Sequence, residues 1–223
     1  MKFRLLLAAA AGSLLAVLCA AGPAHARLCL SFDSSAEDFT RRWSVEAGVA
    51  KITQNTIAAI LRGEIHFDGG MRGGEIYHLG ASYLLGEAVL DIGEREFRPQ
   101  LEAPVFLEIF DENERSPFLS YNAALRLRWV DFPWNDTVRT TFAYGAGFSY
   151  SEKIPRMEYK RSLRNKDERR THLKFTMPAD ISFAHPRWPE HQVMIFLSHQ
   201  SAGRIFGRGG LNALGVGYRW GFK

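Results

Sequence analysis

The chain has 223 residues, a formal net charge of +4 and two cysteines, and this length suits a single domain. After residue 26, no apolar run approaches the ~20 residues of a membrane-spanning helix, which excludes a helical membrane protein. Only Cys29 lies outside the N-terminal apolar segment, so an internal disulfide is excluded as a source of stability. Composition alone leaves open a soluble exported domain and a transmembrane β-barrel.

The N-terminal segment has the three-part form of a secretory signal peptide. Lys2 and Arg4 precede an apolar run over residues 5–21, and residues 24–26 (AHA) form a small-residue cleavage pattern. This pattern favours cleavage after Ala26 over retention as an uncleaved transmembrane anchor. We therefore predict that residues 1–26 are removed and that residues 27–223 form one domain with a formal net charge of +2.

Alternation of side chains with a period of two is the strongest signal in the rest of the chain. Between residues 142 and 150 the even positions are mostly aromatic, and the odd positions carry only alanine, glycine and serine. In residues 210–222 one face is apolar and ends in Tyr218, Trp220 and Phe222, while the other is rich in glycine. An apolar face that ends in aromatic residues is typical of a lipid-facing strand, and small residues opposite suit the inside of a narrow barrel.

Eight such segments follow one another, each near the ~9–11 residues that a tilted strand needs to cross a bilayer. They are Trp43–Ile52, Gly74–Leu85, Gln100–Phe110, Phe118–Val130, Arg139–Tyr150, Thr171–Phe183, Gln192–Ser201 and Gly210–Phe222. The third is the weakest because Pro104 interrupts it. The sequence predicts an all-β, eight-stranded antiparallel transmembrane β-barrel of the bacterial outer membrane, with a soluble β-sandwich or lipocalin-like barrel as the alternative.

Charged residues occur on the face that would line the inside of this barrel. Arg126 and Arg128 lie opposite the apolar face of the fourth segment, and unpaired arginines cannot point into a sealed apolar core. We expect a buried structural network in the lumen, formed by Glu46, Arg126, Arg128, Lys174, Asp180 and Arg219.

The predicted loops alternate in length. With both termini in the periplasm, the long stretches 53–73 and 151–170 face outside, as in outer-membrane barrels. The second stretch contains a basic run at residues 160–170, which either is solvated or meets the phosphates of lipopolysaccharide. The histidines show no metal-ligand spacing, and no metal, cofactor or nucleic acid is expected.

The seventh segment carries two polar residues on its otherwise apolar face. Alternation places His199 and Ser201 beside Ile195 and Leu197, near the outer leaflet. Residues i and i+2 of a strand lie ~6.6 Å apart at Cα, so the imidazole can reach the hydroxyl and activate it as a nucleophile. The imidazole needs an acceptor on its other nitrogen. We predict Asn212 in that role if the final hairpin pairs it with His199.

The signal peptide, the eight strands and the final hairpin, with His-x-Ser, a glycine-containing loop and an aromatic last strand, resemble the lipid A deacylases of the PagL type. The resemblance implies a membrane-embedded hydrolase that removes an ester-linked acyl chain from outer-leaflet lipid A or lipopolysaccharide. It also implies that His199 is the general base and Ser201 the nucleophile. Two positions depart from the family: Asn212 stands where the family has an acid, and Ala202 stands where an asparagine commonly assists the oxyanion.

Two functions therefore stay open. In the first, Ser201 attacks an acyl ester, His199 takes and returns the proton, and Asn212 holds the imidazole, without metal or cofactor. In the second, the chain is a catalytically silent barrel with an envelope-structural or lipopolysaccharide-binding role, and its polar residues only meet headgroups. Either protein could be a homo-oligomer.

Overall fold

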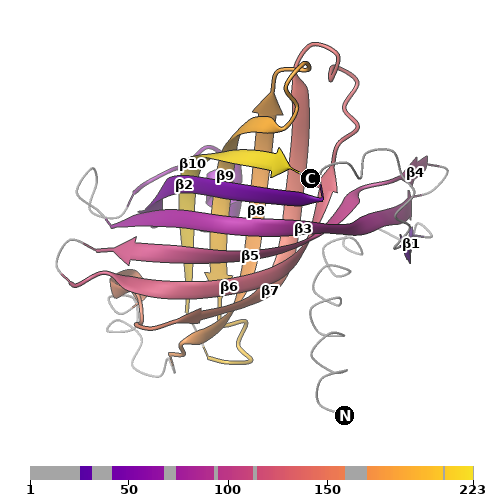
Figure 1. Ribbon diagram of the computed structural model, residues 1–223. Helices are drawn as coiled ribbons and strands as arrows, with labels where there is room; N and C mark the ends of the chain where they lie inside the picture. Colours follow the sequence, from indigo (N-terminus) through magenta and orange to yellow (C-terminus); the bar gives the residue numbers. More distant parts are fainter. Residues whose placement is uncertain are drawn as a thin grey trace.

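A computed structural model shows a twisted antiparallel barrel (Figure 1). The structure describes residues 26–31, 42–67, 74–92, 95–112, 115–158, 170–207 and 209–222. The predicted signal peptide up to residue 25, and the basic run except Arg170, lie outside these residues. The boundary that we expect after Ala26 stays a prediction.

Eight strands close the barrel. They are β2 (Trp43–Thr53), β3 (Glu75–Ile92), β5 (Gln100–Asp111), β6 (Phe118–Trp129), β7 (Arg139–Ser151), β8 (Leu173–Ala184), β9 (His191–Ser201) and β10 (Gly210–Phe222). Each pairs antiparallel with its neighbours in the order β3-β2-β10-β9-β8-β7-β6-β5, and β3 also pairs with β5, which closes the ring. The predicted eight-stranded barrel is confirmed, and the alternative of a β-sandwich is wrong.

Several short elements lie outside this ring. β1 (Ala26–Ser31) and β4 (Arg95–Phe97) both pair with the far end of β3, which runs past its predicted end. The described part of the loop after β2 contains a short helix, α2 (Ile57–Leu61). Thr56 caps its N-terminus, and the Thr56 hydroxyl accepts a hydrogen bond from the N–H of Ala59. None of the helices in the described ranges is long and apolar enough to cross a membrane.

The proline expected to weaken the third strand lies within β5 and is accommodated there. Pairing of β5 with β6 stops at Glu102 and resumes in the same register at Val105, so the ladder is interrupted where Pro104 has no N–H to donate. On its other side, Pro104 still pairs with Ser82 of β3. Pro178 interrupts the β7–β8 ladder in the same way.

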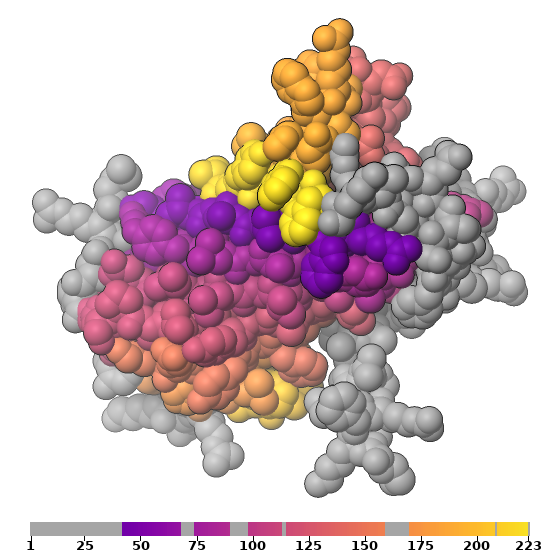
Figure 2. Space-filling model, viewed as in Figure 1, coloured from indigo at the N-terminus to yellow at the C-terminus, as the bar shows by residue number. Residues whose placement is uncertain are grey.

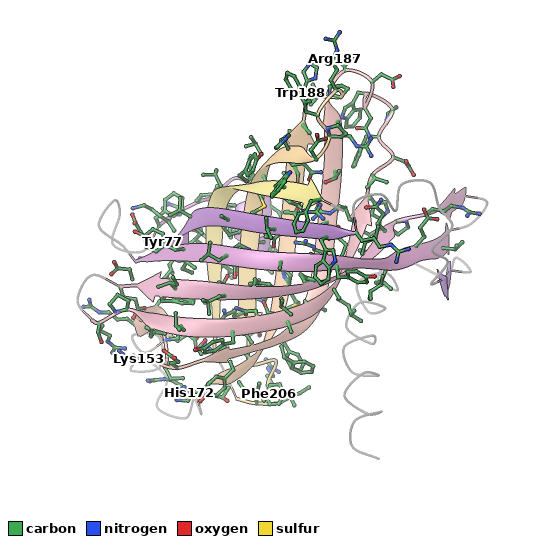
Figure 3. The ribbon with its side chains drawn as sticks, viewed as in Figure 1. Tyr77, Lys153, His172, Arg187, Trp188 and Phe206 are labelled. Atoms are coloured by element: carbon green, nitrogen blue, oxygen red, sulfur yellow. The ribbon has the colours of Figure 1, made fainter. Side chains whose placement is uncertain are left out.

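The two ends of the barrel differ. We call the end at which β2, β5, β7 and β9 finish the outer end, and the opposite end the inner end. The outer end carries the long connections after β2 and β7, whereas short turns join β6 to β7 and β8 to β9 at the inner end. The two inner hairpins project beyond the neighbouring strands (Figure 1), and Arg187 and Trp188 lie at the tip of one of them (Figure 3). The length asymmetry expected of an outer-membrane barrel is present.

Apolar side chains cover the outside of the barrel. On the near face, β2, β3, β5 and β6 form one continuous surface (Figure 2). Exposed residues of the barrel strands include Trp43, Val49, Tyr77, Leu79, Val105, Tyr121, Phe142, Tyr150, Val193, Val216, Tyr218 and Trp220. This arrangement is the reverse of a water-soluble barrel, in which the polar groups face outward.

Charged side chains fill the lumen. Arg126 contacts Glu102 at 2.8 Å, Glu46 at 3.2 Å and Asp180 at 3.3 Å. Arg128 shares Glu102 and Asp180, at 3.0 and 2.8 Å. All of these residues are buried. The network predicted for this part of the lumen is confirmed.

The rest of the lumen agrees with the expected network only in part. Arg219 joins the network as predicted, through Glu102, whereas His78, which was not predicted, joins it through Glu46 at 3.1 Å. Lys174 is also buried, but it pairs with Glu158. Toward the outer end an apolar cluster fills the lumen, formed by Ala50, Ile52, Ile76, Phe110, Phe118, Met157, Met194, Phe196, Leu211 and Ala213.

Candidate active site

His199 on β9 and Asn212 on β10 are direct partners across the final hairpin. Their side chains are hydrogen-bonded, with 2.5 Å between Nδ1 of His199 and Oδ1 of Asn212. The register that we assumed for this hairpin is therefore correct. The outward direction is also correct, because the adjacent Ser198 and Gln200 are buried inside the barrel while His199 is only half-buried.

A second hydrogen bond, on the side of the Asn212 amide away from His199, fixes the orientation of this amide. Its Nδ2 donates to the backbone carbonyl of Asn55, at 2.6 Å, so the amide oxygen is the atom that faces His199. The oxygen can only accept, so Nδ1 of His199 must carry the proton. In the neutral imidazole, Nε2 is then the acceptor, which is the form that a general base requires.

The loop after β2 holds Asn55 in place. The backbone N–H of Asn55 donates to the hydroxyl of Thr53, at 3.2 Å, and its side-chain oxygen accepts from the backbone N–H of His66, at 2.5 Å. Thr53 also pairs with Asn212 across the β2–β10 ladder. Sequence reasoning missed Asn55, because it contributes a backbone carbonyl, which no residue pattern reveals.

Ser201 is the last residue of β9 and is half-buried. Its hydroxyl accepts a hydrogen bond from the N–H of Gly203, at 3.2 Å. Within the described part of the chain no hydrogen bond joins Ser201 to His199, although alternation places both side chains on the same face. A serine hydroxyl has one donor besides its lone pairs, so its O–H stays able to donate to Nε2 of His199.

The loop that follows Ser201 turns sharply. Gly203 has φ +60° and Arg204 has φ +61°, and both values lie in the left-handed region. Ala202 is buried, its N–H donates to the carbonyl of Gly209, and its own carbonyl accepts from Phe206. The Ala202 N–H is thus already used, and the Gly203 N–H is the backbone donor held against the Ser201 hydroxyl.

An aromatic surface adjoins the polar pair. Phe175 on β8 is the direct partner of Ser201, and Met177 is the partner of His199. The ring of Phe175 lies 5.5 Å from that of Phe148 and 5.0 Å from that of Phe206. Phe206 extends from the β9–β10 loop at the outer end (Figure 3). Long apolar groups therefore have a surface to pack on directly beside the serine.

In the ranges that the structure describes, no three histidine, cysteine, aspartate or glutamate side chains gather as a metal site. Of the basic run at residues 160–170, for which solvation and lipopolysaccharide binding were both left open, only Arg170 is described. The candidate site is formed by the side chains of His199, Asn212 and Ser201 and by the backbone groups of Asn55 and Gly203.

Fold and site together define a closed eight-stranded antiparallel barrel with an outward His–Asn pair and a serine in its final hairpin. No protein-family model matches the sequence, and no curated protein matches it. Among solved structures, the chain is similar to the crystal structure of the outer membrane enzyme PagL, at 14% identity over 79% of this chain and 98% of that chain, with a TM-score of 0.47. The barrel itself is established by the strand pairing of this chain.

Proposed function

We propose that this barrel lies in the bacterial outer membrane and hydrolyses an ester-linked acyl chain of lipid A, with Ser201 as nucleophile and His199 as general base. The observation that carries the proposal is the Asn55–Asn212–His199 chain of hydrogen bonds on the outward face of the barrel beside Ser201. It presents the lone pair of an imidazole at a surface where the neighbouring groups are apolar.

The outside of the barrel supports the membrane location. Val105, Val193 and Val216 are each about 57–60% exposed, and the aromatic side chains of Tyr121, Tyr218 and Trp220 are exposed as well. Exposing so large an apolar surface to water is unfavourable, whereas a bilayer accepts it. The site then lies at the outer end, at the depth where acyl chains join their headgroups.

The reaction proceeds through an acyl-enzyme. Ser201 Oγ attacks the ester carbonyl while Nε2 of His199 takes its proton, and the C–O bond to the sugar side breaks as His199 returns that proton to the leaving oxygen. Water, deprotonated by His199, then attacks the acyl carbonyl and releases the fatty acid and Ser201. The Gly203 N–H donates to Oγ, and we expect it to turn to the carbonyl oxygen and stabilise the oxyanion formed in both steps.

Asn212 carries no charge to stabilise the imidazolium of His199, but it orients the imidazole. An amide in place of the acid of a serine–histidine triad costs about 10⁴-fold in rate because it favours the wrong imidazole tautomer. Here the bond to the Asn55 carbonyl turns the amide oxygen toward His199, which enforces the correct tautomer. The remaining deficit is the lost stabilisation of the imidazolium by a negative charge.

A second function is favoured by the missing contact between Ser201 and His199. Because no hydrogen bond joins these two side chains in the described ranges, a catalytically silent barrel with an envelope-structural or lipopolysaccharide-binding role is the competing proposal. Homo-oligomers are compatible with either function.

The test is to express the chain in an outer membrane and to measure lipid A by mass spectrometry. We expect lipid A that is lighter by one acyl chain with the wild type and with Ser198→Ala, whose serine faces the lumen, and unchanged lipid A with Ser201→Ala. Unchanged lipid A beside correctly inserted wild type would contradict the hydrolase and leave the silent barrel.

A further inference from the structure

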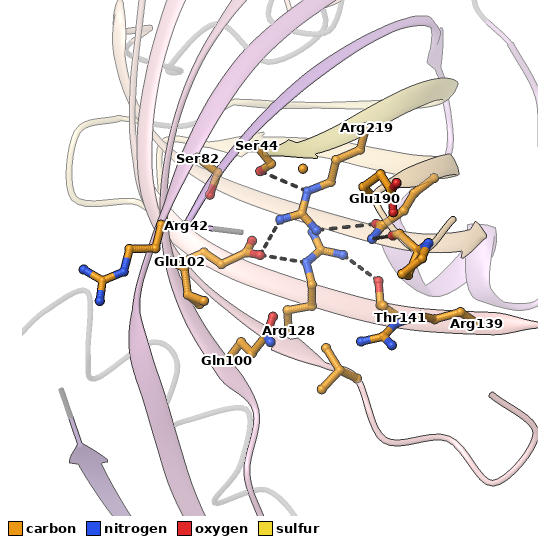
Figure 4. Close-up of a pocket in the computed structure, with 15 residues that line it drawn as sticks. Arg42, Ser44, Ser82, Gln100, Glu102, Arg128, Arg139, Thr141, Glu190 and Arg219 are labelled. Atoms are coloured by element: carbon orange, nitrogen blue, oxygen red, sulfur yellow. Dashed lines mark hydrogen bonds and ion pairs between the residues drawn. The ribbon is translucent and has the colours of Figure 1, made fainter. Parts of the chain in front are cut away.

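A polar cavity of about 170 Å³ opens at the inner end of the barrel, the end opposite His199 (Figure 4). Its lining includes the first residues of β5 and β7, Gln100 and Arg139, and Gly221 near the end of β10. The turn between β8 and β9 contributes Glu190. The chemistry proposed above does not use this cavity.

The lining carries more positive than negative charge. Four arginines and two glutamates line the cavity: Arg42, Arg128, Arg139, Arg219, Glu102 and Glu190. Three of these, Glu102, Arg128 and Arg219, form the inner edge of the lumenal network, where both arginines share the same carboxylate oxygen (Figure 4). Arg128 is also paired with Asp180, which lies outside the lining, so the excess is one positive charge. An excess of guanidinium groups at the edge of a low-dielectric interior attracts an anion.

Arg219 and Ser82 still have donors from which such an anion could accept hydrogen bonds. The guanidinium of Arg219 donates three hydrogen bonds. Its Nε donates to the hydroxyl of Ser44, Nη1 donates one N–H to the side chain of Gln192 at 3.5 Å, and Nη2 donates one N–H to Glu102. Each terminal nitrogen of a guanidinium carries two N–H groups, so two N–H groups of Arg219 have no partner among the described residues. Ser82 also lines the cavity, and its hydroxyl is buried without a hydrogen-bond partner among the described residues.

A buried hydroxyl without a hydrogen-bond partner is unusual and unfavourable. Because Ser82 belongs to a lining with an excess of arginine, an anion is the partner to which its hydroxyl would donate. Tetrahedral oxyanions accept hydrogen bonds from several directions at once, and the planar fork of arginine matches them. We infer that the cavity binds a phosphate group, held by Arg219 and Ser82 with Arg139 at its edge. With the membrane orientation proposed above, the phosphate is either free in the periplasm or part of an inner-leaflet lipid headgroup.

The test is calorimetric titration of the detergent-folded barrel with inorganic phosphate and, separately, with glycerophosphoethanolamine, against chloride at equal ionic strength. We expect saturable binding of at least one of the two phosphates. Binding of the inorganic ion alone identifies free phosphate as the source, and tighter binding of the glycerophosphodiester identifies a headgroup.

Three variants make the result specific. Arg219→Gln and Arg139→Gln should each weaken binding at least tenfold. Ser82→Ala should weaken it several-fold without lowering the melting temperature of the empty protein, because it removes an unsatisfied hydroxyl. Arg62→Gln, in an exposed ion pair at the outer end, should bind like the wild type.

Two results would overturn the inference. One is the absence of saturable binding of either phosphate by the folded wild type. The other is equal binding by the wild type, Ser82→Ala and Arg139→Gln, which would show general attraction to a basic protein. The Ser82 and Arg139 variants keep the test decisive if Arg219→Gln fails to fold.

Discussion

Asn212 presents its amide oxygen to the protonated Nδ1 of His199 across the β9–β10 ladder, at 2.5 Å. The contact depends on a third group, the carbonyl of Asn55, which engages the amide nitrogen. An orienting residue without charge can thus select the imidazole form that accepts a proton from Ser201. The predictions below separate this arrangement from a polar rim without chemistry.

Replacing the orienting amide by a carboxylic acid should accelerate the hydrolysis proposed above. A hydrogen bond to a charged group is worth about 1 kcal/mol more than a neutral one, so Asn212→Asp should raise kcat about fivefold to tenfold. Release of fatty acid from lipid A in mixed micelles measures this, and Asn212→Leu should abolish it. An Asp variant that folds and is slower than the wild type would show that the bond to Asn55 matters more than charge.

The Gly203 N–H should matter for kcat. A Cβ at Gly203 would lie 2.8 Å from the ring of Phe175 and would strain a backbone at φ +60°, so Gly203→Ala should displace the N–H from the oxyanion. Losing one such donor costs roughly 10²–10³ in kcat. Gly63→Ala is the matched control, because Gly63 has φ +80° but nothing within 4 Å of its Cβ. Equal activity of the two variants would remove Gly203 from the site.

The lumenal network should dominate stability. Removing Arg126 leaves the carboxylates of Glu46, Glu102 and Asp180 short of a partner, and breaking a buried ion pair in this way costs roughly 3–5 kcal/mol. Arg126→Met should therefore unfold at much lower guanidinium concentration in detergent. Arg62→Met, which breaks only the exposed pair with Glu64, should change the free energy of unfolding by less than about 1 kcal/mol. Similar values for the two variants would refute a structural role for the network.

The lipid-facing surface gives a further test. Val216 lies in the middle of β10 and is 57% exposed, and an arginine on the lipid face near the bilayer midplane costs about 2–4 kcal/mol. Val216→Arg should lower folding yield and stability in lipid vesicles. Leu61→Arg, at an 81% exposed position of α2, should be neutral. A neutral Val216→Arg would mean that β10 does not face lipid.

The sequence predicts the barrel strands well, because a face toward lipid and a face toward the lumen impose a period of two over ten or more residues. β10 has the predicted bounds, and Arg126 and Arg128 point inward as their parity requires. β1 and β4 were not predicted, since six and three residues are too few for a periodic signal.

The site could be predicted only in part. His199, Ser201 and Asn212 follow from alternation and one assumed register, which is correct. The carbonyl of Asn55 and the N–H of Gly203 belong to the backbone, so their positions depend on loop conformation and leave no mark in residue types. In the lumenal network, Glu102 was not predicted, because Pro104 obscures the alternation of β5.

The central claim is that His199 activates Ser201 as a nucleophile at the barrel surface. A fluorophosphonate that carries a long alkyl chain captures such a serine covalently, and peptide mass spectrometry of the labelled barrel locates the adduct. We expect one adduct, on Ser201, which is lost in His199→Ala and retained in Ser198→Ala. Labelling of Ser201 that is equally fast without His199, or no labelling of the folded wild type, would contradict the account.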